Sequence, residues 1–495
     1  MNDLRRVLLW SVFAVSLMML WDGWLRHTGQ PSLFAPPVQV DAASAASSGA
    51  AARADASVPQ GSSVAGAGAV TASASASDAA SAPKGELLAL HTDLMDVTID
   101  TLGGSVVKAV LLKHRDQEDT QKHVVILDHT ATHTYEAQTG LIGAANQALP
   151  NHKTLFTAQT AERSLADGSN ELVLSLASIP VDGVQLIKTY TFTRGSYAIG
   201  VKQEVVNGSA QALRPTLYVQ IERDGTPPAA APGPAFVGGP QSYTGMAIYS
   251  AKGKYQKIDF AHLDENKAEF EKTDNNGWVA MVQHHFVSAW LDNSTQTREF
   301  FARKVDTNLY TTGMLIPVGD VAAGQRKAVD SVLYVGPQEE DKLSVLAPGL
   351  ELVKDYGWTT ILAKPLYWLL NKLHGLLSNW GWAIIALVVL LKAAFYWLNA
   401  SAYRSMGKMK ALNPRIQALR ETMKDEPQKL QAEMLKIYRE EKVNPIGGCL
   451  PILIQIPVFI ALYSVLSSSV EIRNAPWIGW ITDLSVKDPY FVLPA

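Results

Sequence analysis

The sequence predicts a multi-pass α-helical membrane protein that carries a large antiparallel β-sandwich domain and a helical hairpin. Two apolar runs near the C-terminus each approach the roughly 20 residues that a helix needs to cross the hydrocarbon core of a bilayer. Residues 86–340 instead alternate apolar and polar side chains with the period of two that is typical of strands. Large apolar residues thus concentrate at the N-terminus and after Trp358, which indicates a membrane protein with one large soluble insert.

The bulk composition excludes several classes of function. A net charge of -3 on 495 residues gives no electrostatic footprint for nucleic acid, so we expect no specific nucleic-acid ligand. The single cysteine, Cys449, rules out an internal disulfide and a cysteine-based zinc site. The chain has no Gly-rich phosphate loop, nucleophile elbow or HExxH motif. We therefore expect no cofactor and no metal site.

Residues 1–26 predict an N-terminal transmembrane anchor. Arg5 and Arg6 precede an apolar run that ends at Leu20, and they place the N-terminus in the cytoplasm by the positive-inside bias. A cleaved signal peptide is the alternative. No small-residue cleavage site follows the run promptly, and the tryptophans at its end, such as Trp24, suit a membrane interface. These features favour an uncleaved anchor.

Residues 27–85 predict a disordered tether. This stretch consists mostly of Ala, Ser, Gly and Pro, and it has few large apolar residues after residue 39. Such a composition buries too little surface to offset the conformational entropy of the chain.

Residues 86–340 predict an antiparallel sandwich. Apolar residues alternate along 184–192, a turn follows, and 197–206 forms a second strand-like unit. Many such units at short spacing, with Gly and Asn between them, are typical of a sandwich. Residues 277–290 predict a long buried strand or a pair of strands.

His284 and His285 are the candidate chemical feature of this domain. Adjacent residues on a strand face opposite sides of the sheet, so we do not expect the pair to hold one metal ion. No Cys or Glu lies at ligand spacing beside them, which favours a structural role.

Residues 354–377 predict an amphipathic helix that lies in the membrane interface. Its leucines recur on one helical face, and Pro365 is placed to begin the helix. A core helix of the soluble domain is the alternative. The position directly before an apolar run favours the interfacial interpretation.

Two transmembrane helices are predicted at 380–398 and 445–466. The first is apolar except for Lys392, and the second is apolar except for Gln455. A lysine at a helix centre costs about 2.5–3.5 kcal/mol on insertion scales, so it normally faces a wet cavity or a partner. Snorkelling of Lys392 to the interface and helix–helix hydrogen bonding by Gln455 are the alternatives. Pro451 and Pro457 predict kinks in the second helix.

Residues 399–444 predict a cytoplasmic helical hairpin. Two apolar stripes indicate a coiled-coil-like seam, and the excess of Lys and Arg indicates the cytoplasmic side. The basic residues that we single out are Arg404, Lys408, Lys410 and Arg415. They could form a solvated surface that sets topology, or contact anionic lipid, ribosomal RNA or a nascent chain. A periplasmic loop at 467–488 and the start of a further transmembrane helix at 489–495 complete the chain.

The part of the chain after residue 355 resembles bacterial members of the YidC/Oxa/Alb family of membrane protein insertases. The resemblance is carried by residues 356–370, 379–385, 403–409, 488–490 and 442–459, the last of which reads KVNPIGGCLPILIQIPVF. The whole chain follows the Gram-negative layout of the family. Residues 277–290 carry the best match within the sandwich, where the resemblance is weaker.

The resemblance implies a non-enzymatic function: insertion, folding and assembly of integral proteins of the inner membrane, alone or with the Sec translocon. The implied partners are nascent integral membrane proteins, the Sec translocon, the lipid bilayer and possible ribosome contacts. The implied fold of the periplasmic domain is a mutarotase-like supersandwich. The implied location is the bacterial inner membrane, with the N-terminus in the cytoplasm.

The resemblance also implies a hydrophilic groove that opens to the cytoplasm and to lipid. Lys392 matches the groove's positive residue, although the family usually has Arg there, and a lysine lacks the planar fork of donors that an arginine offers. Gln455 is expected to line the same groove. Phe459, Ile460 and Tyr463 are expected to contact the substrate. Family members have two further helices after residues 488–490, so the resemblance predicts that the chain is C-terminally truncated and that residues 1–495 alone do not insert substrates.

Two other functions compete with insertion. One is a membrane-anchored periplasmic sugar-binding or mutarotase-like protein, which would need a His and a carboxylate together in a cleft of the sandwich. The other is a scaffold that tethers an envelope complex, in which Lys392→Ala would have no effect on insertion.

Overall fold

We analysed a computed structural model of the chain. The structure describes residues 57–59, 84–116, 119, 121–130, 132–144, 147–226, 243–423, 427–441 and 450–486. The predicted anchor at 1–26, most of the tether at 27–85 and the predicted segment 489–495 lie outside the described residues. So does the beginning of the predicted helix at 445–466.

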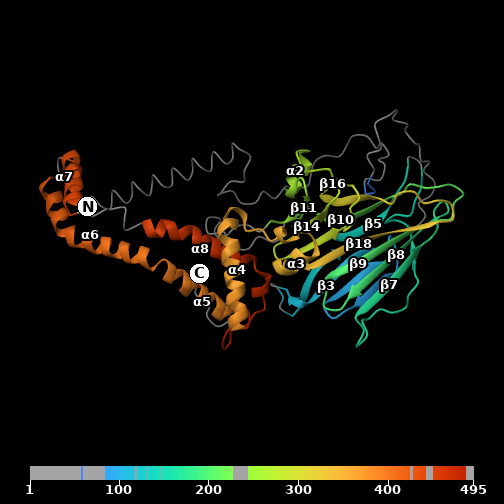
Figure 1. Cartoon of the computed structure of the whole chain (residues 1–495), viewed down its shortest axis with the longest axis horizontal. Coiled ribbons are helices and arrows are strands. Elements are labelled where there is room, and N and C mark those ends of the chain that lie inside the picture. The colour runs from blue at the N-terminus through green and yellow to red at the C-terminus, as the bar shows by residue number, and fades with distance from the viewer. Residues whose placement is uncertain are drawn as a thin grey trace. The chain divides into compact units, whose positions relative to one another are not determined.

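Within the described residues, eighteen strands form two antiparallel sheets of nine strands each (Figure 1). Sheet 1 has the strand order β1 (Leu87–His91), β2 (Met95–Asp100), β3 (Ser105–Arg115), β4 (His123–His129), β5 (Thr134–Ile142), β10 (Thr216–Asp224), β17 (Leu309–Pro317), β16 (Arg298–Asp306) and β13 (Thr273–Asp274). Sheet 2 has the order β12 (Lys254–Ile258), β11 (Gly245–Ser250), β14 (Gly277–Val282), β15 (Phe286–Leu291), β18 (Arg326–Pro337), β9 (Ala198–Asn207), β8 (Val184–Thr193), β7 (Glu171–Ser178) and β6 (Phe156–Ala158). The predicted large antiparallel β domain is confirmed.

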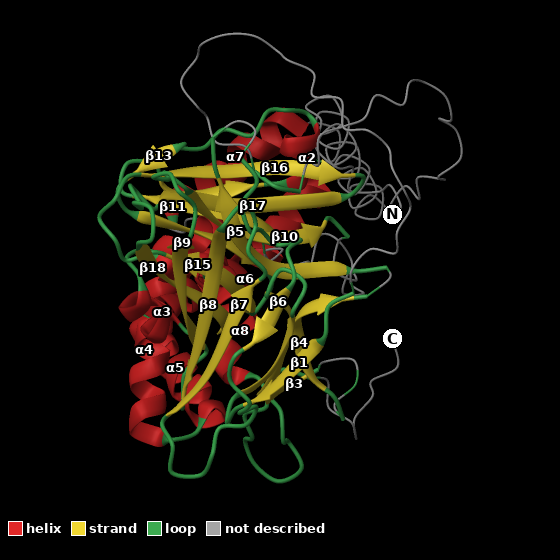
Figure 2. Cartoon of the chain, turned by 90° about the vertical axis from the view of Figure 1, so that its right-hand side faces the viewer, coloured by secondary structure: helices red, strands yellow, loops and turns green. Residues whose placement is uncertain are grey.

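Alternation along the strands sends one set of side chains into a core shared by both sheets. In β8, every second residue from Val184 onward is buried and the intervening residues are less so. The two sheets meet through direct contacts: the Tyr135 hydroxyl of β5 lies 2.5 Å from Ser288 Oγ of β15, and the Trp290 indole donates to the Gln220 carbonyl at 3.0 Å. Figure 2 shows the strands of the sandwich in yellow.

Helices follow the last strand. They are α3 (Glu340–Leu346), η1 (Leu350–Val353), η2 (Gly357–Thr359), α4 (Thr360–Leu377), α5 (Trp380–Ala394), α6 (Tyr396–Thr422), α7 (Pro427–Glu440), α8 (Leu450–Ser468) and η3 (Val470–Ile472). A short helix, α2 (Phe260–Asp264), lies between strands β12 and β13. The predicted helical C-terminal region is therefore confirmed.

Helix α4 begins earlier than Pro365 predicted. The 3-10 helix η2 already turns the chain from Gly357, and α4 continues from it at Thr360, so Pro365 lies inside the helix. The prediction that Pro365 begins the helix was wrong because a helical turn precedes it. The absent N–H of a proline at this position removes one i→i−4 hydrogen bond of the helix.

The helix that carries Lys392 is shorter than predicted. It ends at Ala394, and α6 starts at Tyr396 with an axis that differs by 54°. Among the described helices, none alone has both the length and the apolar composition of a membrane span. The bent pair α5–α6 meets both requirements together, and residues Ile454–Ser468 form a shorter apolar helix.

Helices α6 and α7 contact each other as a hairpin. One member of each predicted apolar stripe is buried, Ile416 on α6 and Ile437 on α7. An ion pair joins the two helices, with Arg415 Nη1 at 3.4 Å from Glu441 Oε1.

Candidate functional site

Helices α4, α5 and α8 enclose one apolar cluster, which is separate from the sandwich core. Small residues on α5 and α8, such as Ala383 and Ala461, are fully buried in it and let the helices approach closely. Its buried members are Tyr356, Ala363, Leu366, Tyr367, Leu370, Ala383, Leu387, Ala461, Leu462, Val465 and Ile472. The cluster holds α5 and α8 in a defined relation, so side chains on their remaining faces form one candidate surface.

The start of α5 is held by three contacts. Asn379 is its N-cap, and the Asn379 side-chain oxygen accepts a hydrogen bond from the Trp382 N–H at 3.2 Å. The Asn379 amide also donates to the carbonyls of Pro476 and Trp477. The Trp477 ring lies so close to Gly381 that a Cβ on Gly381 would be 2.1 Å from Trp477 Cδ1. The segment after α8 is thereby attached to the start of α5.

Lys392 lies in the last turn of α5, directly before the bend. Its side chain is exposed, and Lys392 Nζ is 5.2 Å from the centroid of the Phe459 ring on α8. A cation at this distance is attracted by the negative face of the ring. A positive charge near a helix C-terminus is also stabilised by the unpaired carbonyls there. The structure therefore places the one charged side chain of α5 beside a predicted substrate-contacting aromatic ring.

The predicted residues of α8 lie on one stripe of the helix. Gln455, Phe459 and Tyr463 are spaced four residues apart, so they share a face. Phe459 is 45% exposed and Tyr463 is 53% exposed, whereas Gln455 and Ile460 are partly buried. Lys392 lies beside Phe459, one turn along α8 from Gln455, the other residue predicted to line the groove. The α8 stripe and Lys392 together form the candidate site.

The predicted basic residues of the hairpin all lie on α6. Arg404, Lys408, Lys410 and Arg415 are exposed. Arg415 also forms the ion pair with Glu441 across the hairpin, which gives it a structural contact as well as a surface charge.

A buried polar group at the far end of α8 was not predicted. Lys354 is 3% exposed, and Lys354 Nζ lies 3.1 and 3.2 Å from the two carboxylate oxygens of Glu471. The Tyr367 hydroxyl of α4 donates to the same carboxylate at 2.7 Å, and Lys354 Nζ lies 3.8 Å from the centre of the Tyr367 ring. Burial, and then the neighbouring charge of Glu471, raises the pKa of the Tyr367 hydroxyl far above its ordinary value. Lys354 lies between Glu351 and Asp355 in the sequence, so no local pattern indicates that it is buried against Glu471.

His284 and His285 lie in the turn between β14 and β15, not within a strand. The premise that they face opposite sides of a strand was therefore wrong, and their ring centroids are only 4.0 Å apart. His284 Nε2 lies 3.0 Å from the Ser467 carbonyl of α8. Burial lowers the pKa of His285 to about 2, so this ring is neutral. No cluster of three or more metal-ligating side chains occurs among the described residues.

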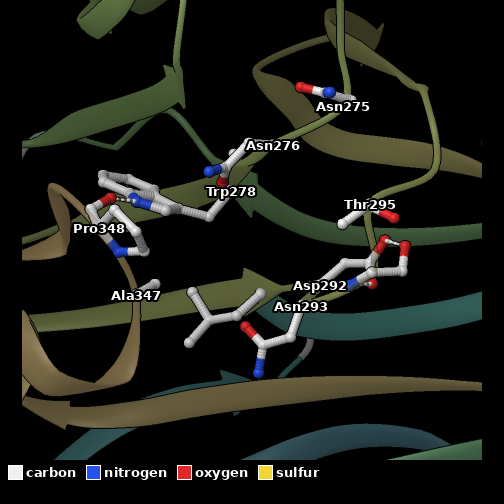
Figure 3. A pocket seen from close by; sticks show the side chains of 11 residues that line it. Asn275, Asn276, Trp278, Asp292, Asn293, Thr295, Ala347 and Pro348 are labelled. Atoms are coloured by element: carbon white, nitrogen blue, oxygen red, sulfur yellow. Dashed lines mark hydrogen bonds between the residues drawn. The ribbon is translucent and has the colours of Figure 1, made fainter.

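The sandwich has a cavity of about 310 Å³ beside β14 and the loop after β15 (Figure 3). Asn275, Asn276, Asn293 and Thr295 contribute polar side chains to its wall. The Trp278 indole is buried and donates to the Pro348 carbonyl at 3.1 Å, so its ring is part of the fold and not a free platform for a ligand.

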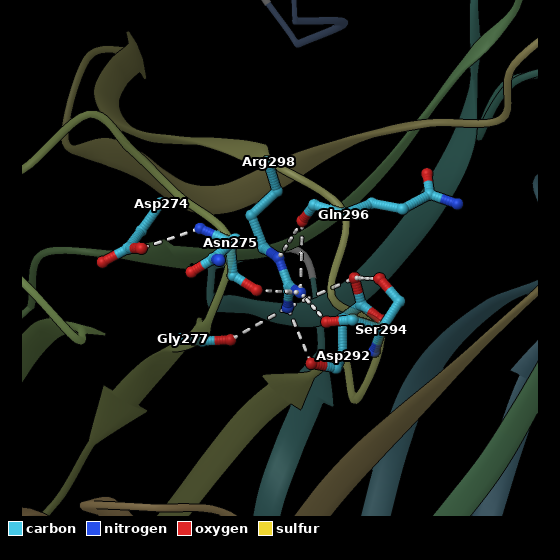
Figure 4. Close-up of polar contacts among 7 residues, drawn as sticks. All are labelled: Asp274, Asn275, Gly277, Asp292, Ser294, Gln296 and Arg298. Carbon is cyan, nitrogen blue, oxygen red and sulfur yellow. Dashed lines mark hydrogen bonds and ion pairs between the residues drawn. The ribbon is translucent and has the colours of Figure 1, made fainter.

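Arg298 supports the wall of this cavity (Figure 4). It is 1% exposed and forms an ion pair with Asp292 at 3.2 Å. Its guanidinium also donates to backbone carbonyls of the surrounding loops, which include Asp292 at 2.7 Å and Asn275 at 3.2 Å. The cavity is thus framed by a structural network.

Two His–carboxylate pairs occur at one end of sheet 1. His129 Nδ1 lies 3.3 Å from Glu136 Oε2, and His133 Nδ1 lies 2.5 Å from Asp224 Oδ2. None of the four residues lines the cavity of Figure 3. The pairs therefore lie outside this cavity.

Comparison with known proteins defines the class of the chain first. The model of the YidC periplasmic domain matches residues 87–369, and the model of the 60Kd inner membrane protein matches residues 372–495. The first match covers the sandwich and continues into α4, and the second covers the end of α4 and the helices after it. The class is that of inner-membrane proteins with a large periplasmic domain.

Close relatives then identify the family. The membrane protein insertase YidC of Cupriavidus necator is 49% identical over 493 residues, which cover 99% of this chain and 86% of the relative. The membrane protein insertase YidC of Burkholderia cenocepacia is 48% identical over 495 residues, again with 99% and 86% coverage. The chain belongs to the YidC family.

Solved structures with a related strand arrangement are distant. A galactose mutarotase related enzyme from Lactobacillus acidophilus matches with a TM-score of 0.31 and 10% identity, over 50% of this chain and 97% of that one. A putative aldose 1-epimerase from Escherichia coli gives a TM-score of 0.31 and 10% identity, over 50% and 98%. At these TM-scores the likeness supports no conclusion about ligand or activity.

Proposed function

We propose that this chain is a membrane protein insertase and chaperone that inserts, folds and assembles integral proteins of the inner membrane. The observation that carries the proposal is the contact of Lys392 with Phe459 on two helices that are otherwise almost entirely apolar. A hydrated cation beside an exposed aromatic ring offers one surface to a polar segment and another to an apolar segment. An incoming membrane protein presents both kinds of segment.

The proposed topology places the sandwich in the periplasm and the α6–α7 hairpin in the cytoplasm. It includes the anchor at 1–26, the tether at 27–85, the interfacial helix at 354–377 and the two spans at 380–398 and 445–466. The excess of Lys and Arg in 399–444 supports the cytoplasmic assignment. Exposed tryptophans on and before α4, Trp358 and Trp368, support its place in the interface.

In the proposed mechanism, Lys392 attracts the short polar tail of the substrate into a groove lined by Gln455. The apolar segment of the substrate meanwhile slides along the exposed side chains of Phe459 and Tyr463 and the partly buried side chain of Ile460. Since Lys392 lies in the last turn of α5, its charge is near the predicted cytoplasmic end of that helix, where a tail would enter. The proposed partners are nascent integral membrane proteins, the Sec translocon and the bilayer. The exposed cations of α6 support contact with anionic lipid or a ribosome.

Site-specific photo-crosslinking tests the proposed substrate path. A photoreactive residue placed at Gln455 or Phe459 should crosslink to a stalled nascent membrane protein. The matched control is Ala461, which is fully buried against the other helices of the cluster. Equal crosslinking from Ala461 and Phe459 would contradict the proposed path, because only one of these positions is exposed.

Charge substitution tests the role of Lys392. Measured in a chain extended to the length of its relatives, of which this sequence covers 86%, Lys392→Ala should reduce the insertion of substrates with short polar tails several-fold. Lys392→Arg in the same extended chain should retain insertion because the positive charge remains. Lys372→Ala is the control, since Lys372 is an exposed lysine on α4. If Lys392→Ala inserts substrates as well as the unmodified chain does, a tethering scaffold would replace insertion as the interpretation.

A further inference from the structure

The central part of the outer face of sheet 1, on β5 and β10, is polar, but it is buried. In β10, Leu217, Val219 and Ile221 point into the sandwich core, so the residues between them lie on the opposite face. An outer sheet face is ordinarily exposed to water. Here Gln220 is 0% exposed and Glu222 is 6% exposed. We call this surface the polar face; its residues are Glu136 and Gln138 of β5, Tyr218, Gln220 and Glu222 of β10, and Arg303 of β16.

The register of the strands assembles these residues into one surface. Gln220 pairs with Gln138 on β5 and with Gly313 on β17. The Gln220 amide donates to Gln138 Oε1 at 2.6 Å, and the Gln138 amide donates to Glu136 Oε1 at 2.5 Å. Gly313 leaves room for this arrangement, because a Cβ there would lie 2.8 Å from Gln220 Cβ.

A short piece of the tether contacts this surface. The Ser57 carbonyl accepts hydrogen bonds from Gln220 Nε2 at 3.1 Å and from Arg303 Nη2 at 3.2 Å. Ser57 Oγ lies 3.2 Å from Nε2 of His152, whose Nδ1 lies 2.5 Å from the Tyr218 hydroxyl. Pro59 is buried. A backbone carbonyl held by two side-chain donors is the contact by which a surface recognises a peptide, whatever the peptide's side chains are.

The polar face retains capacity for more peptide contacts. Gln220 Oε1, Glu222 Oε2 and Arg303 Nε are buried, and none of them has a hydrogen-bond partner among the described residues. Buried polar atoms without partners are costly, so such sites usually serve a ligand or water. Two of these atoms accept and one donates, which matches the N–H and C=O groups of an extended chain.

We propose that the polar face of sheet 1 is a peptide-binding site, and that its ligand in this protein is the tether segment around Ser57–Pro59. The segment combines a small hydroxyl residue with a proline, and it belongs to a stretch of mostly small residues that fits close to a sheet. Docking divides the tether into two parts. The part between the anchor and the sandwich is then residues 27–56, so docking shortens the reach of the sandwich from the anchor.

Covalent attachment strengthens this docking. A ligand joined to its site by a flexible linker has an effective concentration in the millimolar range. Residues 60–86 connect Pro59 to β1, and the composition of most of this stretch predicts a disordered tether. A weak three-residue contact is therefore sufficient to keep the site occupied.

Photo-crosslinking in the full chain tests the proposal. A photoreactive residue at Val58 should crosslink to peptides of β10 or β16, whereas one at Val70, farther along the tether, should not. The double variant Gln220→Leu with Arg303→Met should abolish the Val58 crosslink because both donors to the Ser57 carbonyl are lost. Arg326→Met, which removes an exposed arginine from sheet 2, should leave the crosslink unchanged.

A second measurement does not depend on the folding of the double variant. A labelled peptide of residues 54–61 should bind a chain from which residues 57–59 are deleted, and should bind the unmodified chain at least several-fold more weakly. Fluorescence anisotropy of the labelled peptide measures its binding to each of the two chains. Equal binding to the two chains, or Val58 crosslinks that reach other proteins or match those from Val70, would overturn the proposal.

Discussion

In the β-sandwich, charged and polar side chains are buried among partners, whereas in the C-terminal helices large apolar side chains remain exposed. Lys188 is 0% exposed within the sandwich and donates to the carbonyls of Gly103 and Thr139 at 2.6 and 2.8 Å. In the helical region, Ile361 is 85% exposed and Trp397 is 77% exposed. The sandwich thus buries polar side chains, whereas the helical region exposes apolar ones.

The difference shows which region can cover its apolar surface and pair its polar groups without another molecule. A monomeric protein in water rarely exposes large contiguous apolar patches, so the helical region needs lipid, substrate or a partner around it. The sandwich already satisfies most of its buried polar groups internally. The polar face of sheet 1 is one of the places where buried polar atoms lack a partner, and the tether supplies part of what this face lacks. The following predictions test this contrast, beginning with the largest expected effect.

The Arg298–Asp292 pair should be the strongest single polar contact of the sandwich. Both side chains are 0% exposed, so Arg298→Met leaves the Asp292 carboxylate buried without its partner. Breaking such a pair typically costs about 3–5 kcal/mol of unfolding free energy. Urea unfolding followed by tryptophan fluorescence measures this loss of unfolding free energy.

The control for this substitution is Arg326→Met. Arg326 pairs with Glu204 at 3.0 Å, but its side chain is 70% exposed. An exposed pair contributes about 0–1 kcal/mol. Equal losses for the two variants would show that burial does not set the strength of ion pairs in this sandwich.

Glu222 should make the stability of the sandwich depend on pH. Burial, and then the charge of Glu136, raises the pKa of Glu222 from 4.5 to about 7, against the opposing charges of Lys153, Arg303 and His129. The folded state therefore binds more protons than the unfolded state between these values. The unfolding free energy should fall as pH rises from about 4.5 to about 7, by up to roughly 3 kcal/mol. In Glu222→Gln, the unfolding free energy should no longer show this fall with pH. Unfolding curves recorded at several pH values between about 4.5 and about 7 measure it.

Close packing in the helical region should make Gly381 intolerant of a side chain. A Cβ at this position would lie 2.1 Å from Trp477 Cδ1. Gly381→Ala should cost about 1–3 kcal/mol through overpacking. Thermal unfolding in detergent, followed by circular dichroism of the helices, measures the change.

Gly375 on α4 provides the matched control. A Cβ on Gly375 would meet no atom within 4 Å, so Gly375→Ala should raise helix stability by about 0.5–1 kcal/mol. A destabilisation by Gly375→Ala as large as that of Gly381→Ala would contradict the packing described around Trp477.

The N-cap of α5 should have the smallest effect. Asn379→Ala removes the acceptor for the Trp382 N–H and should cost about 1 kcal/mol. Asn379→Asp keeps the acceptor and loses only the amide that donates to Pro476 and Trp477. The same thermal measurement should therefore rank Asn379→Asp between the unmodified chain and Asn379→Ala.

Patterns within one element were predictable from the sequence. The strand predicted at 184–192 is β8 (Val184–Thr193), and the strand predicted at 197–206 is β9 (Ala198–Asn207). The region at 277–290 is a pair of strands, which was one of the two predicted alternatives. Alternation with period two is a property of neighbouring residues, so a single strand reveals it.

The start of helix α4 and the turn between β14 and β15 were less predictable. Pro365 was expected to begin a helix that in fact starts at Thr360, because the preceding 3-10 turn had no clear signal in the sequence. His284 and His285 were interpreted as strand residues, although they form the turn between two strands. Both errors concern places where one element meets another.

The sequence by itself determined the two regions of this protein, their types of secondary structure and the residues Lys392 and Gln455 that interrupt the apolar helices. Only the tertiary structure decided that Lys392 lies beside Phe459, that Lys354 is buried against Glu471, and that Ser57 contacts the polar face of sheet 1. The physical reason is the separation along the sequence of the residues involved. Hydrophobic periodicity is set by residues a few positions apart, whereas these contacts join residues far apart in the sequence, and the register of strands and the packing of helices bring them together.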